Sequence, residues 1–301
     1  MRRERINKIA TDVDPVRSKN SKNSADSLAN RTSYGVDVKQ LLEAGAHFGH
    51  KTSRWHPKMA PYIHSKRDGN HIIDLTKTVE QLGKALGFLT ETAAAGKQIL
   101  LVSTKRQAHD KIKEVAEATE NPYVTERWLG GMLTNQPTIG GRIKYLKDLE
   151  ARMANGELEA KYSKLEVQRY AEEIEAMNHL YGGIKNMPAK PGAIFVADVI
   201  TNRHAVREAQ KLKIPVVALV DTNVDPTMID YPIPANDDAT KTINVILDYI
   251  QKAIEDGKSK VKKVAPVEEE KTKAEEKPTE EAAKKVAGQP EPANEPVKGI
   301  G

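Results

Sequence analysis

The apolar residues of the middle of the chain form short runs and helical stripes that alternate along the sequence. Three runs are apolar throughout, as expected for strands buried on both faces: Ile99–Val102, Ala193–Ala197 and Pro215–Val220. Stripes with helical spacing lie between and around them, over Thr76–Ala95, Lys105–Ala118, Ala205–Leu212 and Asn236–Glu255. Short buried strands separated by helices predict an α/β fold with a doubly wound, mostly parallel sheet.

Before the first predicted strand and at the start of the last predicted helix, the sequence pattern is less regular. Val38–Phe48 is interpreted as a short helix, and Ile72–Leu75 as a short apolar stretch that follows a polar loop. Asn236 is expected to cap the last helix, with Asp237 and Asp238 in its first turn, where negative charge complements the helix dipole.

One segment, residues 137–182, interrupts the alternation with two consecutive helical stripes. Pro137 suits a first helical turn, and Asn155-Gly156 marks the end of the first helix. Ser163-Lys-Leu-Glu166 is a capping box that opens the second helix, and Gly182-Gly183 closes it. Each helix has one apolar seam, so the segment predicts an inserted antiparallel helical hairpin that leans partly on the sheet domain or on a partner.

The two ends of the chain lack any apolar period. Residues 1–33 and 258–301 are rich in polar and charged residues, so we expect both to be disordered, the second as an Ala/Glu/Lys/Pro tail. The α/β domain is then expected to comprise residues 34–136 and 183–257, a length that supports one sizeable core.

The charge of the protein is uneven. The net charge is +5 over 301 residues, but residues 1–33 account for +4 of it, and residues 34–257 hold 29 basic and 29 acidic side chains. A surface for nucleic acid on the body must therefore come from local clustering of basic residues.

Several classes of site are excluded by composition and motif. With no cysteine, the chain has no disulfide, thiolate zinc site or cysteine nucleophile. It contains no Gly-x-Gly-x-x-Gly, no Gly-x-Ser-x-Gly and no His-Glu-x-x-His motif, so we expect no cofactor, no catalytic residue and no metal site.

The longest apolar run, Ile214–Val220, is too short to span a membrane, and the start lacks a secretory signal, so a cytoplasmic location is expected.

Basic residues cluster in three places. Residues 47–73 hold five basic side chains and one acidic one, interleaved with Trp55 and Tyr62. Lys105-Arg106 follows a predicted strand at the start of a helix, and Arg127-Trp128 precedes two glycines. Lys and Arg contact phosphates and exposed aromatic rings stack on unpaired bases, which favours RNA only slightly over a merely solvated surface or a packed tryptophan.

Two other sets of residues leave alternatives open. Asp198, Asp221 and Asp225 follow predicted strands, at the edge where open α/β sheets bind ligands. Turn chemistry is the favoured interpretation of them, because no activating partner for catalysis can be named. Five histidines lie within residues 47–71, and His47 and His50 would share a helix face. Few carboxylates lie near them in the sequence, so whether this segment binds a metal is left open.

Several long motifs, in order, resemble the small-subunit ribosomal protein S-two family in its bacterial form, over about residues 37–257. They are LLEAGAHFGH (41–50), RWHPKMAPYI (54–63), HIIDL (71–75), STKRQA (103–108), RWLGGMLTN (127–135), IPVVALVDTN (214–223), DP (225–226), IDYPIP (229–234) and NDDA (236–239). Ser103 and Ala235 stand where the family usually has glycine, and Gln136-Pro137 replaces an aromatic–Lys pair, so the entry into the hairpin is expected to differ.

The resemblance implies a flavodoxin-like α/β domain with a helical hairpin, and a non-catalytic constituent of the small ribosomal subunit. It further implies contact with 16S ribosomal RNA and with neighbouring proteins, including recruitment of ribosomal protein S-one. The RNA-binding candidates, carried over by position together with Lys66 from the basic cluster, are Lys51, Arg54, Lys58, Lys66, Arg67, Lys105, Arg106, Arg127, Trp128 and Asn135.

Two other functions stay open at this stage. One is a small-molecule or sugar-phosphate-binding α/β enzyme that uses the Asp198/Asp221 end of the sheet. The other is a relative of the S-two family with a scaffolding or adhesive role outside the ribosome. Neither the RNA nucleotides contacted, nor the order of assembly, nor the role of the two ends can be read from the sequence.

Overall fold

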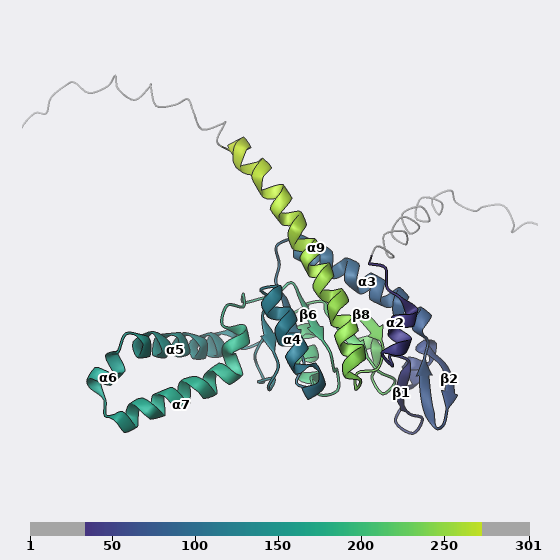
Figure 1. Ribbon diagram of the computed structural model, residues 1–301, viewed down its shortest axis with the longest axis horizontal. Helices are drawn as coiled ribbons and strands as arrows, with labels where there is room; N and C mark the ends of the chain where they lie inside the picture. The colour runs from purple at the N-terminus through teal and green to yellow at the C-terminus, as the bar shows by residue number, and fades with distance from the viewer. Residues whose placement is uncertain (1–33, 273–301) are drawn as a thin grey trace, which may run out of the picture. The chain divides into compact units, whose positions relative to one another are not determined.

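A parallel sheet of five strands forms the centre of the computed structural model, which describes residues 34–272. The strands are β4 (Ile99–Val102), β5 (Tyr123–Val124), β6 (Ala193–Val196), β7 (Val216–Val220) and β8 (Tyr231–Pro234), in the spatial order β5-β4-β6-β7-β8. In chain order, the second strand of this sheet (β5) lies at the edge beside the first (β4), and the third (β6) lies on the other side of β4. This is the doubly wound order of flavodoxin-like sheets. The predicted fold class is confirmed (Figure 1).

The three strands predicted from apolar runs are confirmed, and the two edge strands were missed. β5 has only two residues, too few to give a pattern. β8 contains Pro232 and Pro234, which weaken a strand prediction. Proline lacks the amide hydrogen that a central strand needs, and the edge position of β8 tolerates it.

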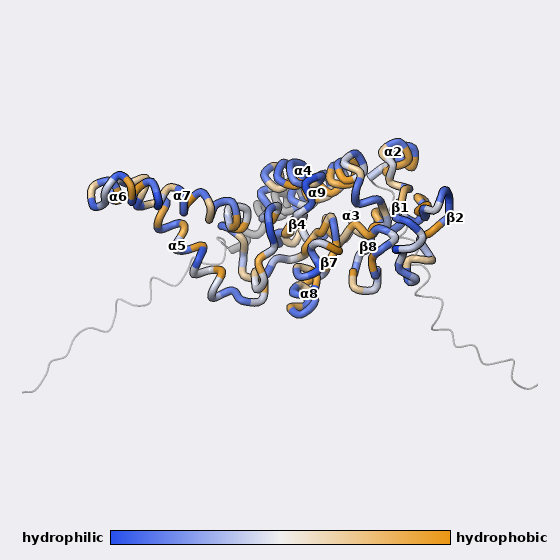
Figure 2. The backbone as a smooth tube through the Cα atoms, turned by 90° about the horizontal axis from the view of Figure 1, so that it is seen from below, coloured by the Kyte–Doolittle hydropathy of each residue, from blue (hydrophilic) through white to orange (hydrophobic). Residues whose placement is uncertain are grey.

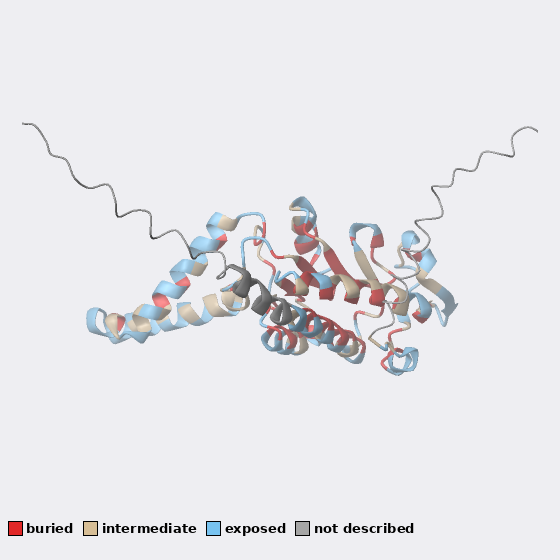
Figure 3. Ribbon diagram, turned by 90° about the horizontal axis from the view of Figure 1, so that it is seen from above, coloured by how far each residue is buried: buried red, intermediate tan, exposed pale blue. Residues whose placement is uncertain are grey.

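Alternate residues of the central strands build two separate hydrophobic cores. Ile99 and Leu101 of β4 belong to one core, whereas Leu100 and Val102 belong to the other. The side chains of a strand alternate between its faces, so a strand buried on both sides is apolar at every position. Figure 3 shows the buried residues concentrated in the sheet and on the helix surfaces that face it.

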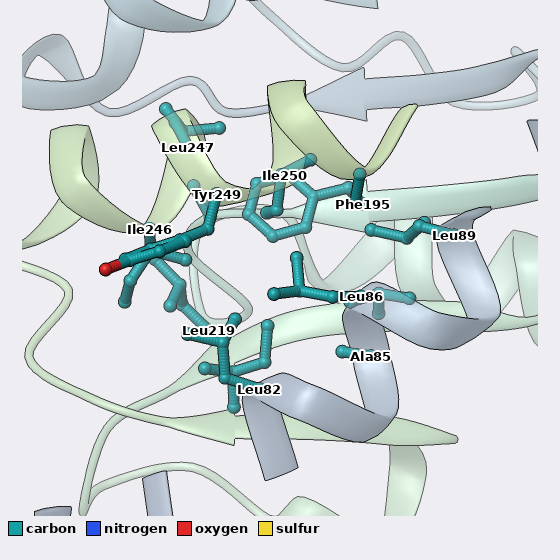
Figure 4. Close-up of a cluster of buried hydrophobic side chains, with 14 of the residues drawn as sticks. Leu82, Ala85, Leu86, Leu89, Phe195, Leu219, Ile246, Leu247, Tyr249 and Ile250 are labelled. Carbon is teal, nitrogen blue, oxygen red and sulfur yellow. The ribbon is translucent and has the colours of Figure 1, made fainter. Parts of the chain in front are cut away.

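Helices cover both faces of the sheet. The first core is closed by α2 (Val38–Glu43), α3 (Leu75–Ala94), α4 (Arg106–Ala118) and α9 (Thr240–Thr272). In Figure 4, Leu82 and Leu86 of α3 and Ile250 of α9 meet over Phe195 and Leu219 of the sheet. The second core is closed by α8 (Arg203–Lys211) and by residues of the loop before the helical hairpin.

The last helix differs from its prediction at both ends. It begins at Thr240, and Asn236 is not its cap, because the Asn236 side chain accepts the amides of Asp238 and Ala239 in a turn before the helix. It also continues past the expected end at Glu255, through Thr272. Gly257 does not stop it, because the glycine is where α9 approaches α3: a Cβ there would lie 2.5 Å from the Thr90 carbonyl oxygen. Residues 1–33 and 273–301, part of the predicted disordered ends, lie outside the described residues.

A small antiparallel sheet precedes the parallel one and was not predicted. Its strands are β1 (Phe48–Lys51), β2 (Ile63–Arg67) and β3 (Asn70–Ile73), in the order β1-β3-β2, with the 3-10 helix η3 (Pro57–Tyr62) between β1 and β2. The predicted helix over Val38–Phe48 is therefore too long. Asp68 and Gly69 join β2 to β3 with φ of 50° and 79°. An Asp-Gly pair with two positive φ angles is a typical two-residue hairpin turn, so the sequence did contain a signal for this sheet.

The inserted segment forms the helices α5 (Gln136–Ala154), α6 (Glu157–Lys161) and α7 (Lys164–Tyr181), followed by the 3-10 helix η4 (Gly182–Ile184). The predicted capping box at Ser163 and Glu166 is present, whereas the short helix α6 was not predicted. Helix α7 has no buried residue, and its tube in Figure 2 alternates between hydrophilic and hydrophobic residues. The hairpin rests on the second core through Ile139 and Ile184. No helix of the described part is long and apolar enough to span a membrane.

Candidate nucleic-acid interface

The small sheet and the loop after β1 present four basic side chains to solvent. Lys51 ends β1, Arg54 follows it, and Lys66 and Arg67 end β2. All four are exposed, and the Arg67 side chain, at 83% exposure, lies 3.7 Å from the similarly exposed Asp68. Ion pairs this exposed are weak, so the charge of Arg67 is available to a phosphate. We call Lys51, Arg54, Lys66 and Arg67 the basic edge.

Lys58, the fifth basic residue of this region, is bound within the protein. Its ammonium group donates to Asp225 over 2.8 Å and to Thr227 over 3.0 Å, which joins η3 to η5 (Pro226–Met228). These hydrogen bonds hold the pKa of the Asp225 carboxyl well below its usual range. Asp225 also accepts the amide of Thr227 as the cap of η5, so this carboxylate has the role of a turn residue. Lys58 is thus partly engaged within the protein, and its assignment as a phosphate ligand stays a prediction.

The aromatic and histidine residues of this region do not converge on one site. His47 and His50 do not share a helix face, because Phe48–Lys51 is a strand. His71 is buried and its ring lies 5.0 Å from that of Trp55, so Trp55 is partly a packing residue. Burial and the charge of Lys66 lower the pKa of His71. His56 caps η3, and His64 is exposed on β2.

The two residues of the predicted patch at Lys105-Arg106 have different surroundings in the structure. Arg106 is exposed in the first turn of α4, as a phosphate contact requires. Lys105 instead lies 3.0 Å from Asp237 and 2.6 Å from Asp238. Burial alone would lower its pKa, but these two carboxylates outweigh burial and raise it. Lys105 is an internal partner of acidic groups, so the structure gives its assignment to RNA no support, and that assignment stays a prediction.

The third predicted patch, which contains Arg127, Trp128 and Asn135, also combines exposed and buried residues. Arg127 and Asn135 are exposed, whereas Trp128 is only 9% exposed and packs in the second core. The indole nitrogen of Trp128 donates to Glu208 over 3.1 Å. A ring buried in this way is not presented to a base, so the structure gives no support to Trp128 as an RNA contact, and that assignment stays a prediction. Gly131 has a φ of 88°, which explains the second glycine of the pair by backbone conformation.

A cluster of acidic groups lies at the carboxyl ends of the parallel strands, beside the basic edge. Thr222, two residues after the end of β7, holds β1 at this cluster, because its hydroxyl accepts the His50 amide over 2.9 Å and its carbonyl accepts the His56 amide over 2.7 Å. A Cβ on Gly49 would lie 2.6 Å from the Thr222 methyl group, so only glycine permits this contact. The His50 ring is then 3.1 Å from Asp221 and 3.5 Å from Asp238.

The electrostatics of this cluster are unusual. Burial, together with the charge of Asp221, raises the pKa of Asp237 to about 6, against the opposing effect of Lys105. The hydrogen bond to Asp221 raises the pKa of His50, although its partial burial acts in the other direction. A cavity of about 290 Å³ opens beside the cluster and is lined by His50, Asp221 and Asp238, and also by Lys51 and Arg54 of the basic edge.

Asp198, the remaining carboxylate considered at the strand ends, is used by its own turn. It accepts the amides of Ile200 over 2.9 Å and Thr201 over 3.2 Å. These bonds favour the turn interpretation of Asp198.

The comparisons with known proteins agree with the sequence motifs. The family described as "Ribosomal protein S2" matches residues 41–257. The chain is 50% identical over 225 residues to "Small ribosomal subunit protein uS2" of Roseiflexus sp. (strain RS-1), which covers 75% of this chain and 86% of the relative. It is 49% identical over 223 residues to the protein of that name from Coprothermobacter proteolyticus, covering 74% and 83%. With that of Fusobacterium nucleatum it is 46% identical over 235 residues, covering 78% and 95%.

Proposed function

The chain belongs to the ribosomal protein S2 family, in its bacterial form, and from this membership we propose that it binds 16S ribosomal RNA through the basic edge. The family makes the chain a structural protein of the small ribosomal subunit, with a role in translation. The ribosome to which it belongs is in the cytoplasm, and we propose no catalytic reaction for it.

The observation that carries the proposal is the difference between free and paired basic residues. Lys58 and Lys105 are each held by a carboxylate within the protein, whereas the four members of the basic edge are exposed on one small sheet and the loop beside it. Phosphate contacts provide most of the affinity of proteins for RNA backbones, and they need basic groups that are not neutralised. Arg106, Arg127 and Asn135 are exposed as well and extend the proposal beyond the basic edge.

Contact with ribosomal protein S-one and with other small-subunit neighbours belongs to the same proposal. It is supported by the family resemblance alone. Purified subunits that carry or lack this chain, probed for bound ribosomal protein S-one, test it directly.

Charge reversal tests the RNA proposal. Arg54→Glu, Lys66→Glu and Arg67→Glu together are expected to release the full-length protein from the small subunit in a sucrose gradient. A matched control reverses three exposed lysines outside the basic edge, with Lys39→Glu, Lys97→Glu and Lys211→Glu. We expect the control to sediment with the subunit. Equal sedimentation of both variants, with both folded by circular dichroism, would contradict the proposal.

A further inference from the structure

A second group of basic residues lies at the amino ends of the parallel strands, at the opposite end of the sheet from the acidic cluster. Lys97 precedes β4, Lys190 precedes β6 and Lys213 precedes β7. These three strands are neighbours and run parallel, so the lysines converge at one edge of the sheet although they are far apart in the chain. All three are exposed, and within the described part of the chain their ammonium groups have no hydrogen-bond or ion-pair partner. We call these three residues the lysine rim.

An apolar cavity of about 520 Å³ lies between the members of the lysine rim. All three line it, together with Phe88, Pro191 and Pro215. A second cavity, of about 400 Å³, shares Lys213 and Pro215 with the first, so the two adjoin. Met228, which is 44% exposed, lines the second cavity. The two cavities form a groove with room for an apolar side chain and for the chain that continues from it.

The backbone places two members of the lysine rim at some cost. Lys213 lies two residues after the end of α8 with a φ of 54°, in the left-handed region where a helix cap is usually glycine. Glycine would avoid the conformational strain, so its replacement by lysine points to a role for the side chain. Gly192 lies against Lys97: a Cβ on the glycine would be 2.5 Å from the Lys97 Cβ. The stem of Lys97 therefore packs directly on the chain that enters β6.

The charge of the groove is positive. The first cavity has the three lysines and one carboxylate, Glu91, in its lining, which leaves a charge of +2. The second cavity adds Asp230, which lowers the total to +1. The Asp230 carboxylate accepts the Val216 amide over 2.9 Å, so this acid is engaged by the strand. Basic groups around an apolar cavity complement a ligand that carries an apolar group between carboxylates.

A peptide fits this groove better than RNA does. Phe88, the aromatic residue of the lining, is half-buried and its ring is stacked on Tyr231, with 4.3 Å between the ring centroids. The ring has little free surface for a base, whereas recognition of unpaired RNA relies on stacking. Phosphate contacts need no apolar cavity, and the side chain that pairs with phosphate in bidentate fashion is arginine, which is absent from the described residues that line the groove.

We propose that this groove binds an acidic peptide segment of a partner protein. An apolar side chain of the segment fills the first cavity, and carboxylates on either side of it pair with Lys97, Lys190 and Lys213. The small sheet is held at the other end of the parallel sheet, through Thr222, so a peptide in the groove leaves the basic edge open. The interaction goes beyond RNA binding and does not depend on it.

Selection from a random peptide display library on the immobilised full-length protein tests the groove. We expect enrichment of sequences that combine aspartate or glutamate with a large apolar residue. The enriched peptides, labelled with fluorescein, are then titrated by fluorescence anisotropy. Lys97→Glu, Lys190→Glu and Lys213→Glu together are expected to weaken their binding by about tenfold or more, because like charges then face each other.

A second variant and a control separate shape from charge. Ala95→Leu, at an exposed position that lines the first cavity, fills the cavity without a change of charge and is expected to cause a similar loss. The matched control reverses three exposed lysines outside the groove, with Lys39→Glu, Lys144→Glu and Lys164→Glu, and is expected to bind the peptides like the unaltered protein. Circular dichroism shows whether each variant is folded, and Ala95→Leu serves if the triple reversal does not fold.

Four results would overturn the proposal. They are the absence of acidic sequences among the enriched peptides, equal weakening by the three-lysine control, unchanged binding by both groove variants, and binding of a labelled oligouridylate that only the groove reversal weakens. The last result would assign the groove to RNA. The proposal for the basic edge is tested separately, since the groove variants should still sediment with the small subunit.

Discussion

The Glu208 carboxylate on α8 accepts a hydrogen bond from the indole nitrogen of Trp128 over 3.1 Å, eighty residues away in the sequence. The same carboxylate accepts the backbone amides of Gly131, Leu133 and Thr134 over 2.8, 3.0 and 3.2 Å. Burial would raise the pKa of Glu208, but these hydrogen bonds outweigh it and lower the pKa. One side chain thus shapes the whole loop that carries Arg127.

Glu208→Ala is expected to lower the free energy of unfolding by about 2–4 kcal/mol, because several partly buried donors lose a charged acceptor together. The lowered pKa means that the stabilisation is present above the ordinary carboxyl pKa and is lost as the pH falls through the lower folded value. The difference between variant and unaltered protein should therefore shrink in acid. Urea unfolding followed by tryptophan fluorescence at pH 7 and pH 3.5 measures both effects. Glu159→Ala, on an exposed position of α6, is the control and should change stability by less than about 0.5 kcal/mol.

Asp237→Asn is expected to stabilise the protein at neutral pH. The pKa of Asp237 is about 6 in the folded chain against 3.8 ordinarily, so its ionisation opposes folding. This penalty is absent below pH 3.8, grows between pH 3.8 and 6, and is complete above pH 6. The variant should gain about 1–3 kcal/mol at pH 8 and nothing at pH 3.5, with the loss of one Lys105 partner reducing the gain.

Urea unfolding in a chelator, repeated across this pH range, measures the effect of Asp237→Asn. The measured quantity is the difference in free energy of unfolding between the variant and the unaltered protein. The prediction would be contradicted if this difference were less favourable to the variant at pH 8 than at pH 3.5.

Gly257→Ala tests the close approach of α9 to α3. A Cβ at this position would lie 2.6 Å from the Ala93 Cβ and 2.5 Å from the Thr90 carbonyl oxygen, so the helices must separate. We expect a loss of about 1–3 kcal/mol, as for other overpacked contacts. Gly87→Ala on α3 is the matched control: nothing lies within 4 Å of its Cβ position, and alanine should stabilise the helix by up to about 1 kcal/mol. Thermal unfolding of the two variants should therefore shift in opposite directions.

Salt dependence measures how many phosphates the basic edge contacts. If Arg54, Lys66 and Arg67 each contact one phosphate of unpaired RNA, they contribute about −2 to the slope of log affinity against log salt concentration. Reversing the three charges should flatten the slope for a 16S RNA fragment by about that amount. The three-lysine control should keep the original slope, and an equal change in both would show a general charge effect instead.

Elements with a strong local pattern were predictable. β4, β6 and β7 are apolar at every position because both faces are covered, and the stripe of α3 repeats every three or four residues because one side meets the core. Phe48–Lys51 gives no such pattern, because its partner β3 lies some twenty residues ahead and its docking residue, Thr222, is 172 residues away from His50. The predicted helix over Val38–Phe48 therefore ran into the first residue of this strand, and the strand itself was missed.

The sequence by itself determined the α/β alternation, the capped hairpin helices, the concentration of basic residues near position 60 and the family motifs. Each depends on residues that are close together in the chain. Only the tertiary structure decided which charges are free. Lys58 is paired by Asp225, Lys105 by Asp237 and Asp238, and Trp128 is buried against Glu208.

The same holds for the cluster of His50, Asp221 and Asp237, which no sequence spacing connects. Whether a charged group binds a partner molecule depends on its distance to the nearest opposite charge and on its exposure to water. Folding sets both quantities by bringing together segments that are distant in the chain.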